Sequence, residues 1–182
     1  TYHQNKIIMK KLLYVVLGLI ALFFIVAAIA PKDYSVVRSV EIDQPNEVVF
    51  EYIKSLKNQD NFSTWMTMDP DMKKTYTGQD GTVGFTSRWE STNEDVGVGE
   101  QEITNIIEGE RIDFELRFEK PWESTSPAWM STESLDSTKT KVVWAFEGHM
   151  PFPMNMMLLF YNMDEMLGKD LQEGLNNLKE IL

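Results

Sequence analysis

The sequence predicts an α+β protein in which an antiparallel sheet wraps onto one long C-terminal helix, preceded by one N-terminal transmembrane helix. Three observations predict this class: an apolar stripe with helical spacing over Pro153–Leu182, a series of short alternating runs over residues 34–147, and an uncharged stretch over Leu12–Ala30. They divide the chain into an N-terminal segment (1–11), a membrane-spanning helix (12–30) and a folded domain (31–182).

The C-terminal stripe has apolar residues in steps of three and four. Such steps place side chains on one face of an α-helix, and most charged residues of the segment fall off that face. Because an apolar face this long must be buried, we expect the helix to lie across the concave face of the sheet. The stripe comprises Met156, Phe160, Met163, Leu167, Leu171, Leu175, Leu178 and Leu182.

Alternating apolar and polar runs, separated by turn signals, predict the strands. The clearest run, Ile112–Phe118, has one apolar and one charged face, which is typical of a half-buried antiparallel strand. Pro45 marks the start of a short helix, and Pro127 predicts an edge position or a bulge. The expected strands are Tyr34–Ile42, Met72–Tyr76, Val83–Glu90, Val96–Ile107, Arg111–Phe118, Thr125–Leu135 and Lys141–Glu147.

The N-terminal apolar stretch, Leu12–Ala30, has about 19 residues and would reach roughly 28 Å as a helix, close to the thickness of a bilayer's hydrocarbon core. Lys6, Lys10 and Lys11 precede it. The positive-inside bias then predicts a single-pass protein of the cytoplasmic membrane, with its N-terminus in the cytoplasm and its domain on the periplasmic or extracytoplasmic side. Because the chain begins at Thr1, Met9 is a candidate natural start.

Two other interpretations of this stretch stay open. Ala28-Ile29-Ala30 resembles the small-x-small cleavage site of a signal peptide, although Pro31 would then be an unfavourable first mature residue. A buried core helix is the other alternative, and an uncharged stretch of this length at a terminus argues against it.

Composition excludes several function classes. The chain has no cysteine, which excludes disulfides and thiolate chemistry. Its net charge of −11 disfavours nucleic acid as a partner, since the chain also lacks a basic stripe. No nucleophile elbow, phosphate-binding loop, dinucleotide fingerprint or histidine-based metal cluster is present in the sequence. We therefore expect no catalytic residues, no cofactor and no metal site.

Several segments resemble the polyketide cyclase/dehydrase-like branch of the START-like (SRPBCC) superfamily, and membrane-anchored bacterial members in particular. The resemblance covers about Tyr34–Leu182 and implies the helix-grip fold, which is that of START and Bet v 1-like domains. Its functional meaning is broad, because the superfamily includes lipid-transfer domains, hormone receptors, cyclases and chaperone activators. The matching segments are Asp43–Phe50, Phe62 with Trp65, Asp69-Pro70, Tyr76–Gly78, Gly84 leading to Trp89, Gly97–Gly99, Gly109–Ile112 and Gly168–Leu175.

The helix-grip architecture implies a cavity between the sheet and the terminal helix, and its aromatic and methionine residues suit an apolar or amphipathic ligand. The alternative is that these side chains simply fill the core. The run Met150–Met157 could form a lip of this cavity or contact lipid or a partner. The candidate ligand-binding residues are Trp65, Phe85, Trp89, Phe114, Trp129, Trp144, Phe146, Met156, Phe160 and Met163.

Three functions follow as hypotheses. The leading one is a membrane-anchored domain that binds a hydrophobic or lipid-like small molecule. The alternatives are a cyclase/dehydratase-like enzyme and an envelope interaction module with a filled core. For the enzyme, Glu100 and Glu102 become candidate buried carboxylates if their strand bulges inward, whereas His149 is expected to point outward together with Glu147.

Overall fold

A computed structural model describes residues 2–182, with side chains from residue 7 onward. Thr1 and the side chain of Lys6, both in the expected N-terminal segment, lie outside the described residues. The chain divides into two compact units. One comprises the residues up to Asp33 together with His149–Asn162, and the other comprises Tyr34–Gly148 and Met163–Leu182. The second unit is called the sheet domain below.

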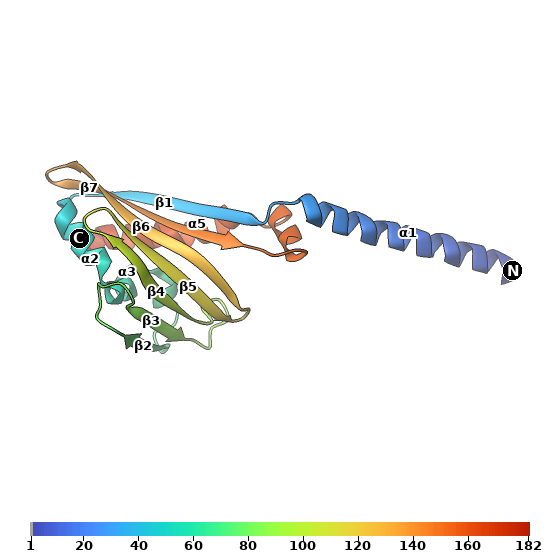
Figure 1. Ribbon diagram of the computed structural model, residues 1–182, viewed down its shortest axis with the longest axis horizontal. Coiled ribbons are helices and arrows are strands. Elements are labelled where there is room, and N and C mark those ends of the chain that lie inside the picture. Colours follow the sequence, from blue (N-terminus) through green and yellow to red (C-terminus); the bar gives the residue numbers. More distant parts are fainter. Residues whose placement is uncertain (1) are drawn as a thin grey trace. The chain divides into compact units, whose positions relative to one another are not determined.

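The sheet domain is built on one seven-stranded sheet with the order β1-β7-β6-β5-β4-β3-β2 (Figure 1). Every pair from β2–β3 to β6–β7 is antiparallel, as the alternating runs predict. Strands β2 to β7 therefore form a meander, and β1 lies at the edge of the sheet next to β7. The strands are β1 Asp33–Ile42, β2 Lys73–Thr77, β3 Thr86–Glu90, β4 Val98–Ile107, β5 Arg111–Lys120, β6 Ser124–Asp136 and β7 Lys139–His149.

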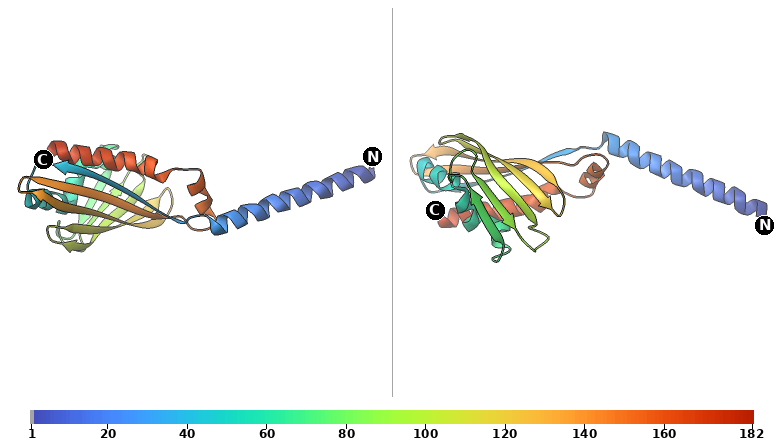
Figure 2. Two further views of the ribbon diagram at one scale, coloured as in Figure 1. Left: turned by 90° about the horizontal axis from the view of Figure 1, so that it is seen from above. Right: turned by 60° about the horizontal axis from the view of Figure 1, so that its bottom comes forward.

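Helices cover one face of this sheet. Helix α5 (Met163–Ile181) lies along it and buries Leu171, Leu175 and Leu178 against it (Figure 2). The short helices between β1 and β2 are α2 Asn46–Lys54, η1 Leu56–Asn58, α3 Gln59–Phe62 and α4 Thr64–Thr67. This arrangement confirms the predicted α+β class with a C-terminal helix on an antiparallel sheet.

The terminal helix is shorter than the apolar spacing predicts. Residues Met154–Leu159 form a separate 3-10 helix, η2, and α5 begins only at Met163. Prolines at 151 and 153 disfavour a continuous α-helix at the start of this segment. Asp164 and Glu165 lie in the first turn of α5, where acidic residues favour a helix start. Met156 and Phe160 therefore fall outside the helix that covers the sheet.

The inner face of the sheet carries the core, and the outer face carries charges. Strand β5 buries Ile112 and Phe114, as its alternation predicts. Arg117, on the opposite face of β5, donates hydrogen bonds to Glu100 at 2.6 Å and Glu102 at 2.7 Å. The two glutamates therefore point outward, contrary to the inward placement considered above, because Gln101 and Ile103 occupy the inner positions of β4.

Pro127 lies where one side of β6 is unpaired. It pairs with Glu115 of β5, whereas pairing with β7 begins one residue later, at Ala128. Because proline lacks the N–H that a ladder requires, this locally free edge is the position expected for it.

Helix α1 (Tyr2–Ile29) contains the apolar stretch. Its segment Ile7–Ile29 has 23 residues and contains an 18-residue window with a mean hydropathy of 3.0, so it is long and apolar enough to cross a membrane. A signal sequence meets the same criterion.

Candidate functional site

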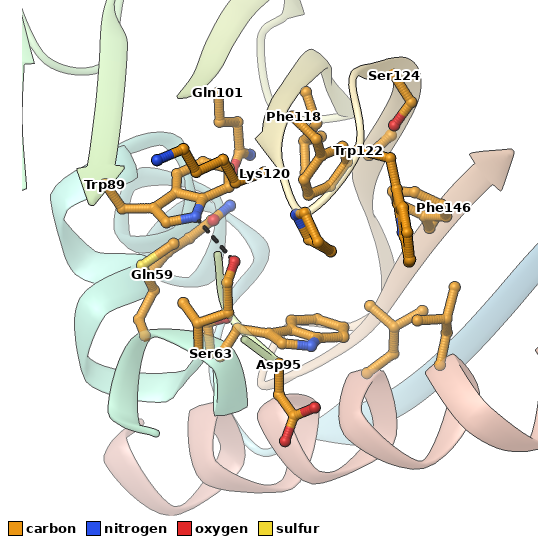
Figure 3. A pocket seen from close by; sticks show the side chains of 18 of the residues that line it. Gln59, Ser63, Trp89, Asp95, Gln101, Phe118, Lys120, Trp122, Ser124 and Phe146 are labelled. Atoms are coloured by element: carbon orange, nitrogen blue, oxygen red, sulfur yellow. Dashed lines mark hydrogen bonds between the residues drawn. The ribbon is translucent and has the colours of Figure 1, made fainter. Parts of the chain in front are cut away.

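A cavity of about 270 Å³ lies inside the sheet domain. Its wall combines residues of β3 to β7, the short helices α3 and α4, the loops that follow β3 and β5, and α5 (Figure 3). Most of the wall is apolar. Its apolar side chains are Trp65, Met66, Trp89, Val96, Leu116, Phe118, Pro121, Trp122, Ala128, Trp144, Phe146, Leu167 and Leu171.

Edge-to-face contacts hold the aromatic wall in place. The ring of Trp144 lies 6.3 Å from that of Trp65, with the two planes at 89°. Phe118 makes similar contacts with Trp89 at 6.0 Å and with Phe146 at 6.4 Å. Such pairs add about 0.5–1.5 kcal/mol each beyond the area they bury. The aromatic wall is therefore a preformed apolar surface.

The position of Trp89 depends on a hydrogen bond and on a glycine. Its indole N–H donates to the carbonyl of Val96 at 3.3 Å, drawn in Figure 3. Its ring packs on Gly99 so closely that a Cβ there would lie 2.8 Å from Trp89 Cζ2. Because glycine has no side chain, the indole approaches β4 closely at this position, where it lines the cavity.

Three buried polar side chains also line the cavity. Gln59 of α3, Ser63 after it and Gln101 of β4 are 3%, 3% and 5% exposed. The side-chain nitrogen of Gln59, Nε2, is buried and has no hydrogen-bond partner in the protein. A buried donor left unpaired costs about 1–3 kcal/mol.

The exposed lining residues mark where the cavity meets solvent. Glu94 and Asp95 belong to the loop after β3, and Trp122, 73% exposed, belongs to the loop after β5. Lys120, at the end of β5, is also exposed. The opening therefore carries charges of both signs beside an exposed indole.

The cavity brings together four of the ten side chains predicted from the sequence to contact a ligand. Trp65, Trp89, Trp144 and Phe146 line it. Phe85 and Phe114 are instead packed in the core, where Phe85 stacks on Tyr76 at 6.1 Å. Ligand binding by these residues is still a prediction.

The other predicted residues lie elsewhere. Trp129 lies on the outer face of β6 beneath the guanidinium of Arg111, 4.2 Å away, because its neighbours Ala128 and Met130 take the inward positions. Met163 begins α5 but is not part of the lining. Met156 and Phe160 belong to the other compact unit, with Phe160 78% exposed.

Several lining residues were missed by the sequence analysis. Leu116 and Phe118 share a strand face with Phe114, so the alternation that identified Phe114 could also have identified them. Gln101 occupies an inward position of β4, and a polar residue at an inward position could have identified it as a lining residue. No pattern identifies Gln59, because α3 has only four residues and its orientation depends on the packing around it.

The buried and the exposed polar groups of the cavity wall differ in chemistry, since its ionisable side chains, Glu94, Asp95 and Lys120, are the exposed ones. The buried polar groups are two amides and a hydroxyl, which donate and accept hydrogen bonds without ionising near neutral pH. His149 contacts Asp33 at 2.6 Å and belongs to the other unit. Among the described residues, no group of three or more histidine, cysteine or acidic side chains could hold a metal ion.

The fold has solved relatives of low sequence identity. Truncated norcoclaurine synthase from Thalictrum flavum is 7% identical over 84% of this chain and 95% of that chain, with a TM-score of 0.63. Protein Mll3558 from Rhizobium loti is 14% identical over 82% and 97%, with a TM-score of 0.58. A protein from Thermobifida fusca is 19% identical over 81% and 91%, with a TM-score of 0.54.

At such identities these likenesses show a shared fold, and they confirm the expected helix-grip architecture. No curated protein matches the chain. The family model for polyketide cyclase / dehydrase and lipid transport proteins matches residues 33–182, which include the whole sheet and α5. The chain therefore belongs to the polyketide cyclase / dehydrase and lipid transport family.

Proposed function

We propose that the sheet domain binds a small, mostly apolar molecule in the cavity between its sheet and α5. The observation that carries this proposal is a cavity of about 270 Å³ with an aromatic wall and an unpaired buried donor. Ligand sites typically have volumes of about 300–1,000 Å³, apolar walls and a few placed polar groups. A cavity just below this range suits a small ligand or the end of a longer one.

The polar groups indicate which chemistry the ligand carries. The unpaired Nε2 of Gln59 requires an acceptor, such as a carbonyl, ether, hydroxyl or carboxylate oxygen. Ser63 and Gln101 add further hydrogen-bonding capacity inside the same cavity. The proposed ligand is therefore amphipathic, with an apolar body against the tryptophans and an oxygen at Gln59.

The proposal also assigns α1 as a retained membrane anchor. Its length and hydropathy support an anchor, and Lys10 and Lys11 before the apolar core favour a cytoplasmic N-terminus with the domain on the other side. N-terminal sequencing and alkaline extraction of the membrane-bound protein test this assignment. Recovery of a soluble chain that begins after residue 30 would contradict it.

Tryptophan fluorescence tests ligand binding directly. The chain has five tryptophans, of which Trp65, Trp89, Trp122 and Trp144 line the cavity and Trp129 does not. A brominated medium-chain fatty acid, whose bromine quenches nearby indoles, should therefore quench most of the emission in a saturable manner. A quenching curve that rises linearly with no saturation would contradict the proposal.

A matched pair of variants controls this experiment. Ala128→Leu adds apolar volume to the cavity wall and should abolish saturable quenching. Thr125→Leu adds a similar side chain on the outer face of the same strand and should leave it unchanged. Equal effects of the two variants would place the probe outside the cavity.

The second candidate function is a cyclase- or dehydratase-like enzyme, which the family's description favours. In that case the cavity would fold a reactive ligand while Gln59 and Ser63 orient a carbonyl. A bound molecule recovered chemically unchanged after long incubation supports binding, whereas conversion that Ala128→Leu abolishes supports the enzyme.

A further inference from the structure

The segment Phe152–Tyr161, called the 152–161 segment below, exposes an unusual concentration of large apolar side chains. Single exposed apolar residues are normal on a protein in water, but a contiguous group marks a surface that is covered by a partner or a membrane. Its exposed members are Phe152 (47%), Met154 (52%), Met157 (44%), Leu159 (50%), Phe160 (78%) and Tyr161 (52%).

The same segment is free of charge in an otherwise charged chain. From Met150 to Tyr161 there is no acidic or basic residue, although charged residues make up 25% of the chain and its net charge is −11. An apolar, uncharged surface on an acidic protein is suited to a lipid environment, since each charge carried into a membrane would oppose its entry.

Direct contacts attach this segment to the C-terminal end of α1, within one compact unit. The side-chain amide of Asn155, which is fully buried, donates to the carbonyls of Ala27 at 2.7 Å and Ala30 at 3.1 Å. The ring of Phe152 lies 5.8 Å from that of Phe24. Asn155 thus pairs carbonyls that the end of a helix leaves without partners, which are costly to leave unpaired at a membrane.

These contacts fix the depth of the segment once α1 crosses a bilayer. The 23 residues Ile7–Ile29 have a length of about 34 Å, close to the roughly 30 Å of the hydrocarbon core, so the end of α1 lies at the membrane–water interface. A segment bonded to Ala27 and Ala30 lies at the same level. Aromatic side chains are favoured there.

We propose that the 152–161 segment is a second membrane contact, which inserts its apolar side chains into the interfacial layer of the leaflet where α1 ends. It rests on the proposed anchor role of α1 and is independent of the cavity. From the sequence, the Met150–Met157 run could be a cavity lip or a contact with lipid or a partner. A membrane contact accounts for its bonds to α1 through Asn155.

The absence of native cysteine allows a direct test with one label per variant. Met157→Cys and Phe160→Cys place an environment-sensitive fluorophore on exposed positions of the segment, and Ser137→Cys places it in the exposed turn between β6 and β7. The full chain is reconstituted in phosphatidylcholine vesicles. Quenching is then compared between a nitroxide-bearing lipid and aqueous iodide.

The proposal predicts blue-shifted emission at 157 and 160, loss of fluorescence with the nitroxide lipid and little loss with iodide. The label at 137 should show the reverse. Adding Leu159→Glu to Phe160→Cys should reduce the lipid quenching, because a charge opposes insertion of the segment.

Other outcomes overturn the proposal in distinguishable ways. If the chain resists alkaline extraction but both labels are quenched by iodide as strongly as that at 137, the membrane contact is wrong and the anchor stands. Labels shielded from both quenchers would identify a second copy or another protein as the covering partner. A chain extracted as a soluble protein would remove the anchor and this inference together.

Discussion

Gln59 combines burial, a position in the cavity wall and a donor with no partner in the protein. Its side chain is 3% exposed, and under the proposed function an oxygen of the bound molecule pairs its Nε2. If a water molecule accepts the hydrogen bond of Nε2, Gln59 does not contribute to ligand specificity. If an oxygen of the ligand accepts it, Gln59 determines which molecules bind. The two cases differ in how affinity responds to substitution.

Replacing this residue should separate ligands by their oxygen content. Gln59→Leu should weaken binding of a medium-chain fatty acid about two- to tenfold, because one hydrogen bond is worth about 0.5–1.5 kcal/mol. Binding of the alkane of equal length should stay the same or improve. Saturable tryptophan quenching or competition with the brominated probe measures both affinities. Equal weakening of both ligands would show that Gln59 acts only through packing.

Gly99 should be intolerant of a side chain because of Trp89. In Gly99→Ala the new Cβ would lie 2.8 Å from Trp89 Cζ2 and 2.7 Å from the backbone oxygen of Arg117, which cannot easily move. We expect a loss of about 1–3 kcal/mol in the free energy of unfolding, typical of overpacking, together with a changed tryptophan emission. Urea unfolding followed by fluorescence measures both. Wild-type stability would contradict the close packing of this indole on β4.

At the scale of elements, an ion pair connects α5 to the sheet. Arg38 of β1 donates hydrogen bonds to both carboxylate oxygens of Asp164 in the first turn of α5, at 2.8 and 2.9 Å. These bonds lower the pKa of Asp164 below its ordinary value of 3.8. The folded state therefore releases this proton more readily than the unfolded chain does.

The sign of this pKa shift predicts a pH dependence of stability. The stability that the Arg38–Asp164 ion pair contributes is present above the ordinary pKa of Asp164. It is lost as the pH falls through the lower pKa of the folded state. Asp164→Asn should therefore destabilise the protein at neutral pH and lose its effect in strong acid. Urea midpoints at the two pH values measure this. A neutral-pH effect that persists in the Arg38→Met background would show that the pair is not its cause.

The sequence predicts elements well where burial imposes a regular period. The alternation of β5 and the leucine spacing from Leu167 onward place side chains as the structure has them, because one face of each element is buried. The prediction fails around Met156 and Phe160. Their spacing continues that of α5, but Asn155 and two prolines give the segment a separate structure, and periodicity does not report such contacts.

At the scale of the whole molecule, the sequence predicts the fold and the existence of a cavity better than the residues that line it. Which aromatic side chains reach the cavity depends on where the core ends, and this distinguishes Trp144 from the fully packed Phe114. Trp129 was misplaced because the alternation of β6 is weak in its sequence, with Pro127 and several small polar residues nearby.

Under the proposed function, the sheet domain carries a small amphipathic molecule in its cavity. Native mass spectrometry of the full chain, released from its membrane without harsh detergent, would detect this molecule. We expect a bound species of defined mass that contains oxygen, retained by Thr125→Leu and absent from Ala128→Leu. A wild-type chain that shows only its own mass, and whose spectrum does not change when medium-chain fatty acids are added, would contradict it.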